Sequence, residues 1–376
     1  MRKCAQQGKG DGFEAKPHGA QAMVKVVNSV KFTTNALRQR LNMQRQQQLA
    51  AWLHSLFPGE SFTLSPASAD ASFRRYFRAT FADGRTRVVM DAPPQHEDCK
   101  PFLHVGKLFE DAGVHVPHVH AQDLAQGFLL LSDLGGTTYA QALAGGDIAN
   151  ARKLYGAATD ALINIQRASR EDELPPYDEG LLRRELNLFP DWYIAKHLGV
   201  TLTTKQQAKL EEVFARIVAN NLAQPRVYVH RDYHSRNLMV TEPNPGVLDF
   251  QDAVYGPITY DLVSLFKDAY IRWEEADIID WLILYWEKAR YAGLPVHADF
   301  GEFYRDYEMM GVQRHIKVLG IFARLYHRDG KEGYLKNMPL VFEYLYRAAC
   351  RYIDLKPLQV LLEELHPQAI RKGYTF

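Results

Sequence analysis

The chain of 376 residues has little cysteine and no long hydrophobic run. Its three cysteines, Cys4, Cys99 and Cys350, are far apart and odd in number, so they indicate neither a disulfide framework nor the C-x-x-C pairs of a zinc site. The densest apolar stretch, 281–286, has six residues, whereas a membrane-spanning helix needs roughly 20. We therefore expect a protein of a reducing compartment, the cytoplasm, with no membrane partner.

The formal net charge of +1 is unevenly distributed along the chain. Residues 1–50 contain nine Lys and Arg against two Asp and Glu, which leaves 36 against 42 for the remainder. The basic residues are scattered and lack interleaved aromatics, so the pattern does not favour nucleic-acid binding. We expect residues 1–42 to be a basic, poorly ordered extension of a monomer whose folded part begins near Met43.

The segment 43–132 has the pattern of a small β-rich lobe. Two strands joined by Asp83-Gly84 form a hairpin, and the small residues of 65–72 predict a mobile loop. The expected helices are 44–56 and 102–112, and the expected strands are 62–64, 73–81, 87–90, 119–124 and 127–131. We expect this lobe to bind a nucleotide.

Beyond a polar, glycine-containing hinge at 133–136, helical periodicity dominates. The expected helices are 137–168, 180–197, 204–221, 260–270, 276–291, 300–327 and 334–352. Short strands are expected at 226–230, 238–240 and 247–250. The sequence therefore predicts an α+β, bilobal fold, with a small β-rich N-lobe and a large, mainly helical C-lobe over 137–376 that carries the catalytic and substrate-binding residues.

The stretch His230–Asn237 matches the H-R-D-x-x-x-x-N pattern of protein-kinase catalytic loops. Phosphoryl transfer from ATP needs an acceptor for the proton of the attacking hydroxyl, and Asp232 is the candidate. It also needs a divalent metal, and Mg²⁺ prefers oxygen ligands such as those of Asn237 and Asp249. Asp249-Phe250 stands where the pattern has D-F-G, so one hairpin would bring both ligands to the same ion.

Two other interpretations of these residues were weighed. Asp232 could cap a helix and Asp249 could end a strand, which explains each residue singly but not their order. His230 and His234 have the spacing of a metalloprotease H-E-x-x-H, but position 231 is Arg. We expect both histidines to brace the catalytic loop through hydrogen bonds to backbone.

At these residues the chain resembles the aminoglycoside phosphotransferase and choline kinase-like superfamily over about residues 45–330. The matching segments are His230–Asn237, Leu248–Ala253, Gly113–Pro117, Leu129–Gly135 and Gly256–Leu265. The resemblance implies a protein-kinase-like fold, ATP and Mg²⁺ as cofactors, adenine binding at Leu131, Asp133 and Leu134, and a helix start at Tyr260-Asp261-Leu262 that supports the site.

A closer likeness is to the bacterial anomeric kinases of N-acetylmuramate and N-acetylglucosamine in cell-wall recycling. It lies in Ala71–Arg78, Val89–Pro94, Leu188–Tyr193, His197–Gly199 and Leu248–Thr259. This resemblance implies ATP-dependent transfer to the C1 hydroxyl. An aminoglycoside or an amino alcohol is the alternative acceptor. The first would demand an acidic groove that the sequence lacks, and the second an aromatic cage that the tryptophans could form.

The chain departs from the kinase pattern at the phosphate-binding elements. The third strand has Met90 and Asp91 where a lysine is expected, and the loop 65–72 has no glycine. We expect Ser72 and the arginines at 74, 75 and 78 to contact the nucleotide, with one arginine supplying the missing cation or Asp91 positioning a basic residue. The alternatives are three solvated arginines and a nucleotide-binding pseudokinase.

The acceptor side is predicted from the helical segment 183–197 and from residues beyond it. Sugar recognition combines polar groups with an aromatic surface. A lactyl carboxylate would favour a guanidinium, which binds carboxylates bidentately. The candidates are Arg184, Glu185, Trp192, Gln251 and Arg314, of which Arg184 and Arg314 are the candidates for the carboxylate. A salt bridge on a helix surface is the alternative role for each arginine.

Overall fold

The computed structural model describes residues 43–68 and 73–367. The expected extension over 1–42, and Ser72, lie outside the described residues. The described part of the chain divides into two compact units, one of residues 43–64 and 80–85 and one of 65–68, 73–79 and 86–367. The hinge expected at 133–136 stays a prediction.

The described part of the first unit is built around a helix over residues 43–56. Leu49 and Leu53 are buried on one face of this helix, as the spacing i, i+4 predicts. Phe57 packs edge-on against Phe81 with ring centroids 4.8 Å apart. The expected helix 44–56 is thus confirmed.

Five strands form one sheet in the order β1-β2-β3-β5-β4. They are β1 (Phe62–Ser68), β2 (Arg75–Phe81), β3 (Thr86–Asp91), β4 (Val119–Asp123) and β5 (Phe128–Ser132). β3 and β5 are antiparallel, with Asp91 opposite Phe128. The loop predicted over 65–72 is wrong for 65–68, which continue β1 because small residues tolerate extended backbone.

Helix α2 (Lys100–Asp111) follows the first three strands and presents an apolar face. The buried residues of α2 are Phe102, Val105, Leu108 and Phe109. Phe102 packs against Phe250, with ring centroids 4.9 Å apart. Helix α2 is therefore held to the segment after β8 by aromatic contacts.

The second unit continues with a mainly helical region. Its helices are α3 (Tyr139–Ala142), α4 (Ile148–Arg167), α5 (Glu179–Leu188), α6 (Thr204–Ala223), α7 (Tyr260–Phe266), α8 (Glu275–Tyr291), α9 (Phe300–Asp329), α10 (Met338–Arg351) and α11 (Lys356–Leu365). A π-helical segment, η1 (Phe189–His197), extends α5, and two short 3₁₀ turns, η2 (Glu332–Asn337) and η3 (Ile353–Leu355), flank α10. The α+β fold with a β-rich N-lobe and a helical C-lobe is confirmed.

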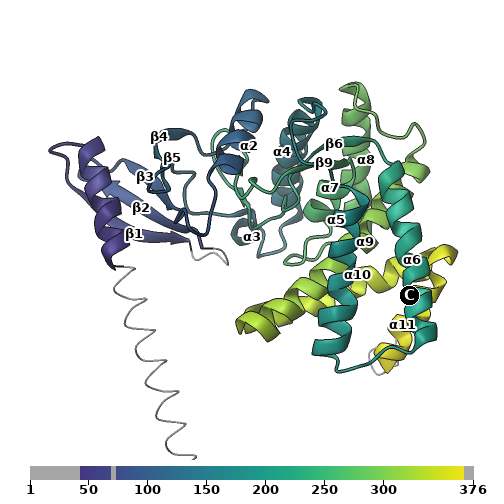
Figure 1. The fold of residues 1–376 in the computed structure, drawn as a ribbon. Coiled ribbons are helices and arrows are strands. Elements are labelled where there is room, and N and C mark those ends of the chain that lie inside the picture. Colours follow the sequence, from purple (N-terminus) through teal and green to yellow (C-terminus); the bar gives the residue numbers. More distant parts are fainter. Residues whose placement is uncertain (1–42, 69–72, 368–376) are drawn as a thin grey trace, which may run out of the picture. The chain divides into compact units, whose positions relative to one another are not determined.

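Helix α9 is the element around which the helical region is organised. It packs against α5, α6, α7, α10 and η1 (Figure 1). Its middle stretch, Tyr307–Gly320, is buried on every side, which is typical of a core helix. Gly320 lies so close to α5 that a Cβ placed there would be 2.4 Å from the carbonyl carbon of Leu188. The polar side chains of this stretch of α9 therefore lie in the protein interior.

Two small antiparallel ladders interrupt the helices. β6 (Arg226–Val229) pairs with β9 (Val254–Pro257), and β7 (Leu238–Met239) pairs with β8 (Gly246–Val247). The hairpin expected between 238–240 and 247–250 is confirmed, although its second strand starts one residue earlier and is shorter. β9 and α11 were not expected from the sequence. Within the described residues, no helix is long and apolar enough to cross a membrane.

Candidate active site

The loop that follows β6 is fixed by a buried carboxylate. Asp261, at the start of α7, accepts hydrogen bonds from the backbone nitrogens of His230 (2.7 Å) and Arg231 (3.0 Å). Arg231 has a φ of +76°, a conformation that costs a non-glycine residue of order 1 kcal/mol or more. These bonds hold the chain through the turn, as expected of a helix start that supports the site.

The two histidines of the loop have different environments. His230 is buried, and burial lowers its pKa to about 4. Its neutral ring places Nε2 2.9 Å from the carbonyl oxygen of Leu248, and Nδ1 accepts from the backbone nitrogen of Asp232. His234 packs edge-on against Tyr270, and its Nδ1 has no hydrogen-bond partner in the described chain. The expected bracing role is confirmed for His230 and not for His234 Nδ1.

Asn237 lies between Asp232 and Asp249. Its side-chain amide nitrogen donates to the backbone oxygen of Asp232 (3.0 Å) and to Oδ2 of Asp249 (3.3 Å). Gln251 donates to Oδ1 of Asp249 (2.8 Å). Asp249 has a φ of +63°. The pairing of β7 with β8 holds the segment that contains Asp249 beside the loop that contains Asp232 and Asn237. The structure thus brings the three predicted residues together.

The charge state of Asp232 is set by several basic groups. Burial alone would raise its pKa, but the nearby positive charges, chiefly that of Lys317 and also that of Arg314, outweigh burial, so the pKa lies below its usual value. Asp232 is therefore an ionised carboxylate at neutral pH. An ionised carboxylate can accept a proton or orient a hydroxyl.

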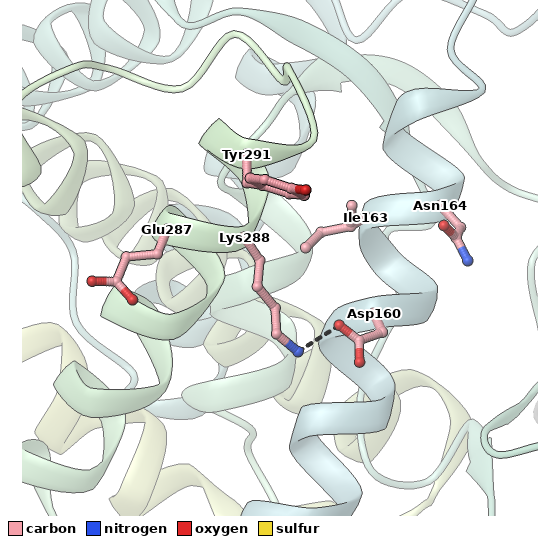
Figure 2. Close-up of a pocket in the computed structure, with 6 residues that line it drawn as sticks. All are labelled: Asp160, Ile163, Asn164, Glu287, Lys288 and Tyr291. Atoms are coloured by element: carbon pink, nitrogen blue, oxygen red, sulfur yellow. Dashed lines mark hydrogen bonds and ion pairs between the residues drawn. The ribbon is translucent and has the colours of Figure 1, made fainter.

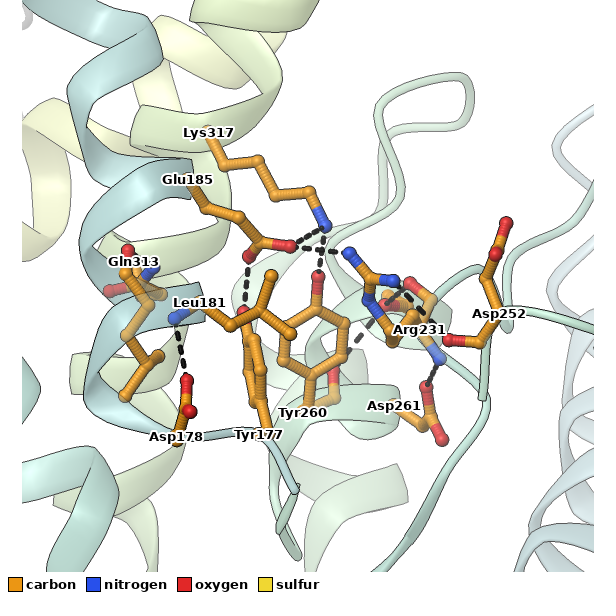
Figure 3. Close-up of polar contacts among 12 residues, drawn as sticks. Tyr177, Asp178, Leu181, Glu185, Arg231, Asp252, Tyr260, Asp261, Gln313 and Lys317 are labelled. Carbon is orange, nitrogen blue, oxygen red and sulfur yellow. Dashed lines mark hydrogen bonds and ion pairs between the residues drawn. The ribbon is translucent and has the colours of Figure 1, made fainter. Parts of the chain in front are cut away.

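Behind the loop, α5 and α9 contribute a buried polar network (Figure 3). Glu185 Oε1 accepts from Arg231 (2.6 Å) and lies 2.8 Å from Nζ of Lys317, while Tyr177 donates to Oε2. Lys317 also donates to the hydroxyl oxygen of Tyr260 (2.9 Å). Burial opposes the ionisation of Glu185, but the two cations outweigh it and hold its pKa below the usual value. Glu185, a predicted substrate contact, lies in this network.

Lys317 was not predicted from the sequence, which gives no motif that could have found it. Among the other substrate candidates, Arg184 is exposed, Trp192 is half-buried, and Gln251 and Arg314 are buried. Arg184 and Glu185 are adjacent in α5 and therefore point in different directions.

The three arginines near β2 are all engaged by carboxylates. Nε and a terminal nitrogen of Arg75 both donate to Oδ2 of Asp91 in β3, whose side chain is fully buried. Arg78 binds the carboxylate of Asp133 and the carbonyl oxygen of Gly135 (2.7 Å). Arg74 precedes β2 and pairs with Glu97 at 3.0 Å.

The predicted adenine-binding residues lie at the end of β5. Leu131 is in the strand, and Leu134 is buried just after it. Asp133 accepts from the backbone nitrogen of Gly135 (3.0 Å) as well as from Arg78. The segment after the strand is thereby tied to the sheet.

Asn237 and Asp249 fit a magnesium ion by their chemistry. Among the described residues, no group of three or more His, Cys, Asp and Glu side chains has an arrangement that could hold a metal ion. A carboxylate beside an amide suits Mg²⁺, which usually keeps waters and phosphate oxygens as further ligands. Asn237 would present its amide oxygen to such an ion.

A hollow of about 560 Å³ lies elsewhere, between α4 and α8. Asp160 and Lys288 form an ion pair of 2.6 Å in its wall, and Tyr291 stands exposed beside them (Figure 2). None of the predicted site residues lines it. This hollow is therefore separate from the catalytic loop.

The fold and the arrangement around Asp232 define a kinase-like phosphotransferase. The chain matches the model of the phosphotransferase enzyme family over residues 63–294. It is 52% identical over 336 residues to the N-acetylmuramate/N-acetylglucosamine kinase of Neisseria meningitidis, covering 89% of this chain and 100% of that protein. The chain therefore belongs to the phosphotransferase enzyme family and is an ATP-dependent kinase.

One further relative supports this membership, and one solved structure shows the same fold. A kinase of the same name from Pseudomonas aeruginosa is 52% identical over 332 residues, with 85% of this chain and 97% of that protein covered. The solved choline/ethanolamine kinase family protein from Mesorhizobium loti has a TM-score of 0.55 at 14% identity, covering 85% of this chain and 99% of that one. The superfamily resemblance predicted from the sequence is confirmed.

Proposed function

We propose that this protein is a cytoplasmic sugar kinase that transfers the γ-phosphoryl group of ATP to the anomeric C1 hydroxyl of N-acetylmuramate or N-acetylglucosamine in peptidoglycan recycling. The observation that carries the proposal is the constellation of Asp232, Asn237 and Asp249 in a chain that aligns over 89% of its length with a kinase named for these sugars.

Asp232 accepts the proton of the C1 hydroxyl, or orients that hydroxyl, as the oxygen attacks the γ-phosphorus. The lowered pKa of Asp232 keeps it ionised for this role. Asn237 and Asp249 hold Mg²⁺, which neutralises charge on the β- and γ-phosphates when bound. Gln251 keeps the Asp249 carboxylate in place through its hydrogen bond.

Arg75 supplies the phosphate-binding cation that β3 lacks. In protein kinases this cation is a β3 lysine held by a glutamate of the following helix. Here the buried face of α2 is apolar, and the buried carboxylate is Asp91 of β3 itself. The ion pair of cation and carboxylate thus lies within the sheet here, with the guanidinium on β2 and the carboxylate on β3. Ser72 and Arg74 are further phosphate contacts, and the segment Leu131–Leu134, whose Asp133 is held by Arg78, receives the adenine.

The proposal is tested by incubating the full chain with Mg-ATP and each amino sugar, and by identifying the product by mass spectrometry. We expect a sugar 1-phosphate from the wild-type protein. Asp232→Asn should lose roughly 10²–10⁴ in kcat while ATP still binds.

The control is Asp252→Asn, a change in the same segment at an exposed side chain, which should leave the rate unchanged. Equal turnover by Asp232→Asn would reject the catalytic assignment. Phosphorylation of an aminoglycoside or amino alcohol in place of both sugars would reject the substrate, and ATP binding without transfer to any acceptor would indicate a scaffold.

A further inference from the structure

Arg314 of α9 is a buried cation without a hydrogen-bond or ion-pair partner among the described residues. Its relative exposure is 4%. Its NH1 has no hydrogen-bond partner, and its guanidinium forms no ion pair with any carboxylate in the described chain. A buried guanidinium without a partner is strongly destabilising, because it loses its hydration and gains no hydrogen bond or ion pair to compensate for that loss.

The other cations buried to the same degree in the described residues are satisfied. Lys267 pairs with Glu308, and Lys317 pairs with Glu185 at 2.8 Å. Both lysines therefore receive a carboxylate from the fold itself. The contrast indicates that Arg314 takes an anionic partner from outside the described residues.

Arg314 also lies at the catalytic loop. It is one helical turn from Lys317, so both residues share a face of α9, and both are among the charges that lower the pKa of Asp232. Two more buried polar atoms without partners belong to the same site, namely Nδ1 of His234 and Oε1 of Gln251. Unsatisfied buried groups gathered beside a reactive carboxylate are expected where a polar ligand completes the structure.

We propose that Arg314 binds the anionic group of the acceptor, the lactyl carboxylate of N-acetylmuramate, and so determines the preference between the two amino sugars. This inference rests on the proposed function. The carboxylate is attached through an ether at C3 of the ring that carries the reacting C1 hydroxyl, so one sugar can present both groups to one site. N-acetylglucosamine has no carboxylate and leaves Arg314 unpaired.

The second source of an anion at this place is the phosphoryl group in transfer, which both sugars share. The choice of substrate distinguishes the two. Contact with the carboxylate affects N-acetylmuramate alone, whereas contact with the phosphoryl group affects both sugars equally.

The experiment compares kcat/KM of the wild-type chain, Arg314→Gln and Arg314→Lys on N-acetylmuramate and N-acetylglucosamine. Arg314→Gln should lose about 30-fold or more on N-acetylmuramate, and its loss on N-acetylglucosamine should be about tenfold smaller, because that sugar is affected only by the missing charge near Asp232. Arg314→Lys should recover part of the loss, because it keeps the charge but not the bidentate geometry. The matched control is Arg328→Gln, an exposed arginine in the last turn of α9 itself, which should change neither value.

Thermal melting checks the fold of each variant, and the methyl ester of N-acetylmuramate serves as a second probe if a variant does not fold. The wild-type protein should use the ester no better than N-acetylglucosamine. Equal losses on both sugars, or equal use of acid and ester, would overturn the inference. Failure of the wild-type protein to phosphorylate either sugar would instead reject the proposed function.

Discussion

We predict that Glu185 stabilises the protein by neutralising the two cations behind the catalytic loop, Arg231 and Lys317. The substitution Glu185→Gln keeps the shape of the side chain and removes its charge. Arg231 and Lys317 then lose the carboxylate that both contact now, at 2.6 and 2.8 Å. Because Glu185 and Lys317 are both buried, water cannot replace the lost interaction.

The magnitude follows from this burial. Removing one partner of a buried ion pair typically destabilises a protein by about 3–5 kcal/mol. For a chain of this size we expect each kcal/mol to lower the melting temperature by roughly 2 °C, which gives a decrease of about 6–10 °C. We also expect kcat to fall about tenfold, a barrier increase of about 1.4 kcal/mol, because Lys317 is then free to pair with Asp232.

A double-mutant cycle isolates the pair. Lys317→Met in the Glu185→Gln background removes one unpaired cation, so the double variant should be more stable than the sum of the single effects by about 1–3 kcal/mol. The control is Glu211→Gln, which breaks the exposed ion pair to Arg183 and should cost about 1 kcal/mol or less. Urea unfolding measures each free energy. Additivity of the two single substitutions within about 0.5 kcal/mol would refute the charge argument.

Two further predictions concern stability. Gly320→Ala places a Cβ 2.4 Å from the backbone of Leu188 and should lower the free energy of unfolding, measured with urea, by at least about 1–3 kcal/mol. The control is Gly156→Ala in α4, which has open space around it and should raise that free energy by about 0.5–1 kcal/mol. Equal effects of the two substitutions would contradict the close approach of Gly320 to Leu188. Burial raises the pKa of Asp261 to about 7, so the native state holds a proton that the unfolded state releases, and its contribution to the free energy of unfolding falls as pH rises from about 4 to 7. Asp261→Asn should remove this slope, and identical pH profiles for variant and wild type would count against it.

The catalytic residues were predictable because they are close in sequence and because a single hairpin is enough to connect them. Asp232 and Asn237 share a loop, and a single hairpin of β7 and β8 returns the chain to Asp249. Local spacing and turn chemistry are sufficient for such an arrangement. Most strands and helices were predicted for the same reason, since each has its own periodicity, although the single helix expected over 137–168 is two helices, α3 and α4.

What the sequence did not predict depends on contacts between distant segments. Lys317 reaches Glu185 because α9 packs against α5, and no periodicity in either helix states which pair of polar residues will meet. β9 was missed because Val254–Pro257 contains glycine and proline and becomes a strand only by pairing with β6. α11 was missed because it has a proline in its first turn and lies beyond 352, where the helical periodicity of 334–352 ends.

The arrangement of charges around Asp232 connects the fold to the chemistry. A buried carboxylate stays ionised only where nearby cations offset the loss of water, and here Lys317 and Arg314 contribute to that effect. Glu185 pairs with both Lys317 and Arg231, and Arg314 has no ion pair among the described residues, so positive charge is in surplus on this face of α9. A surplus cation beside the catalytic carboxylate favours an acceptor that carries a negative charge of its own, and one helix thereby serves both the reactivity of Asp232 and the choice of acceptor.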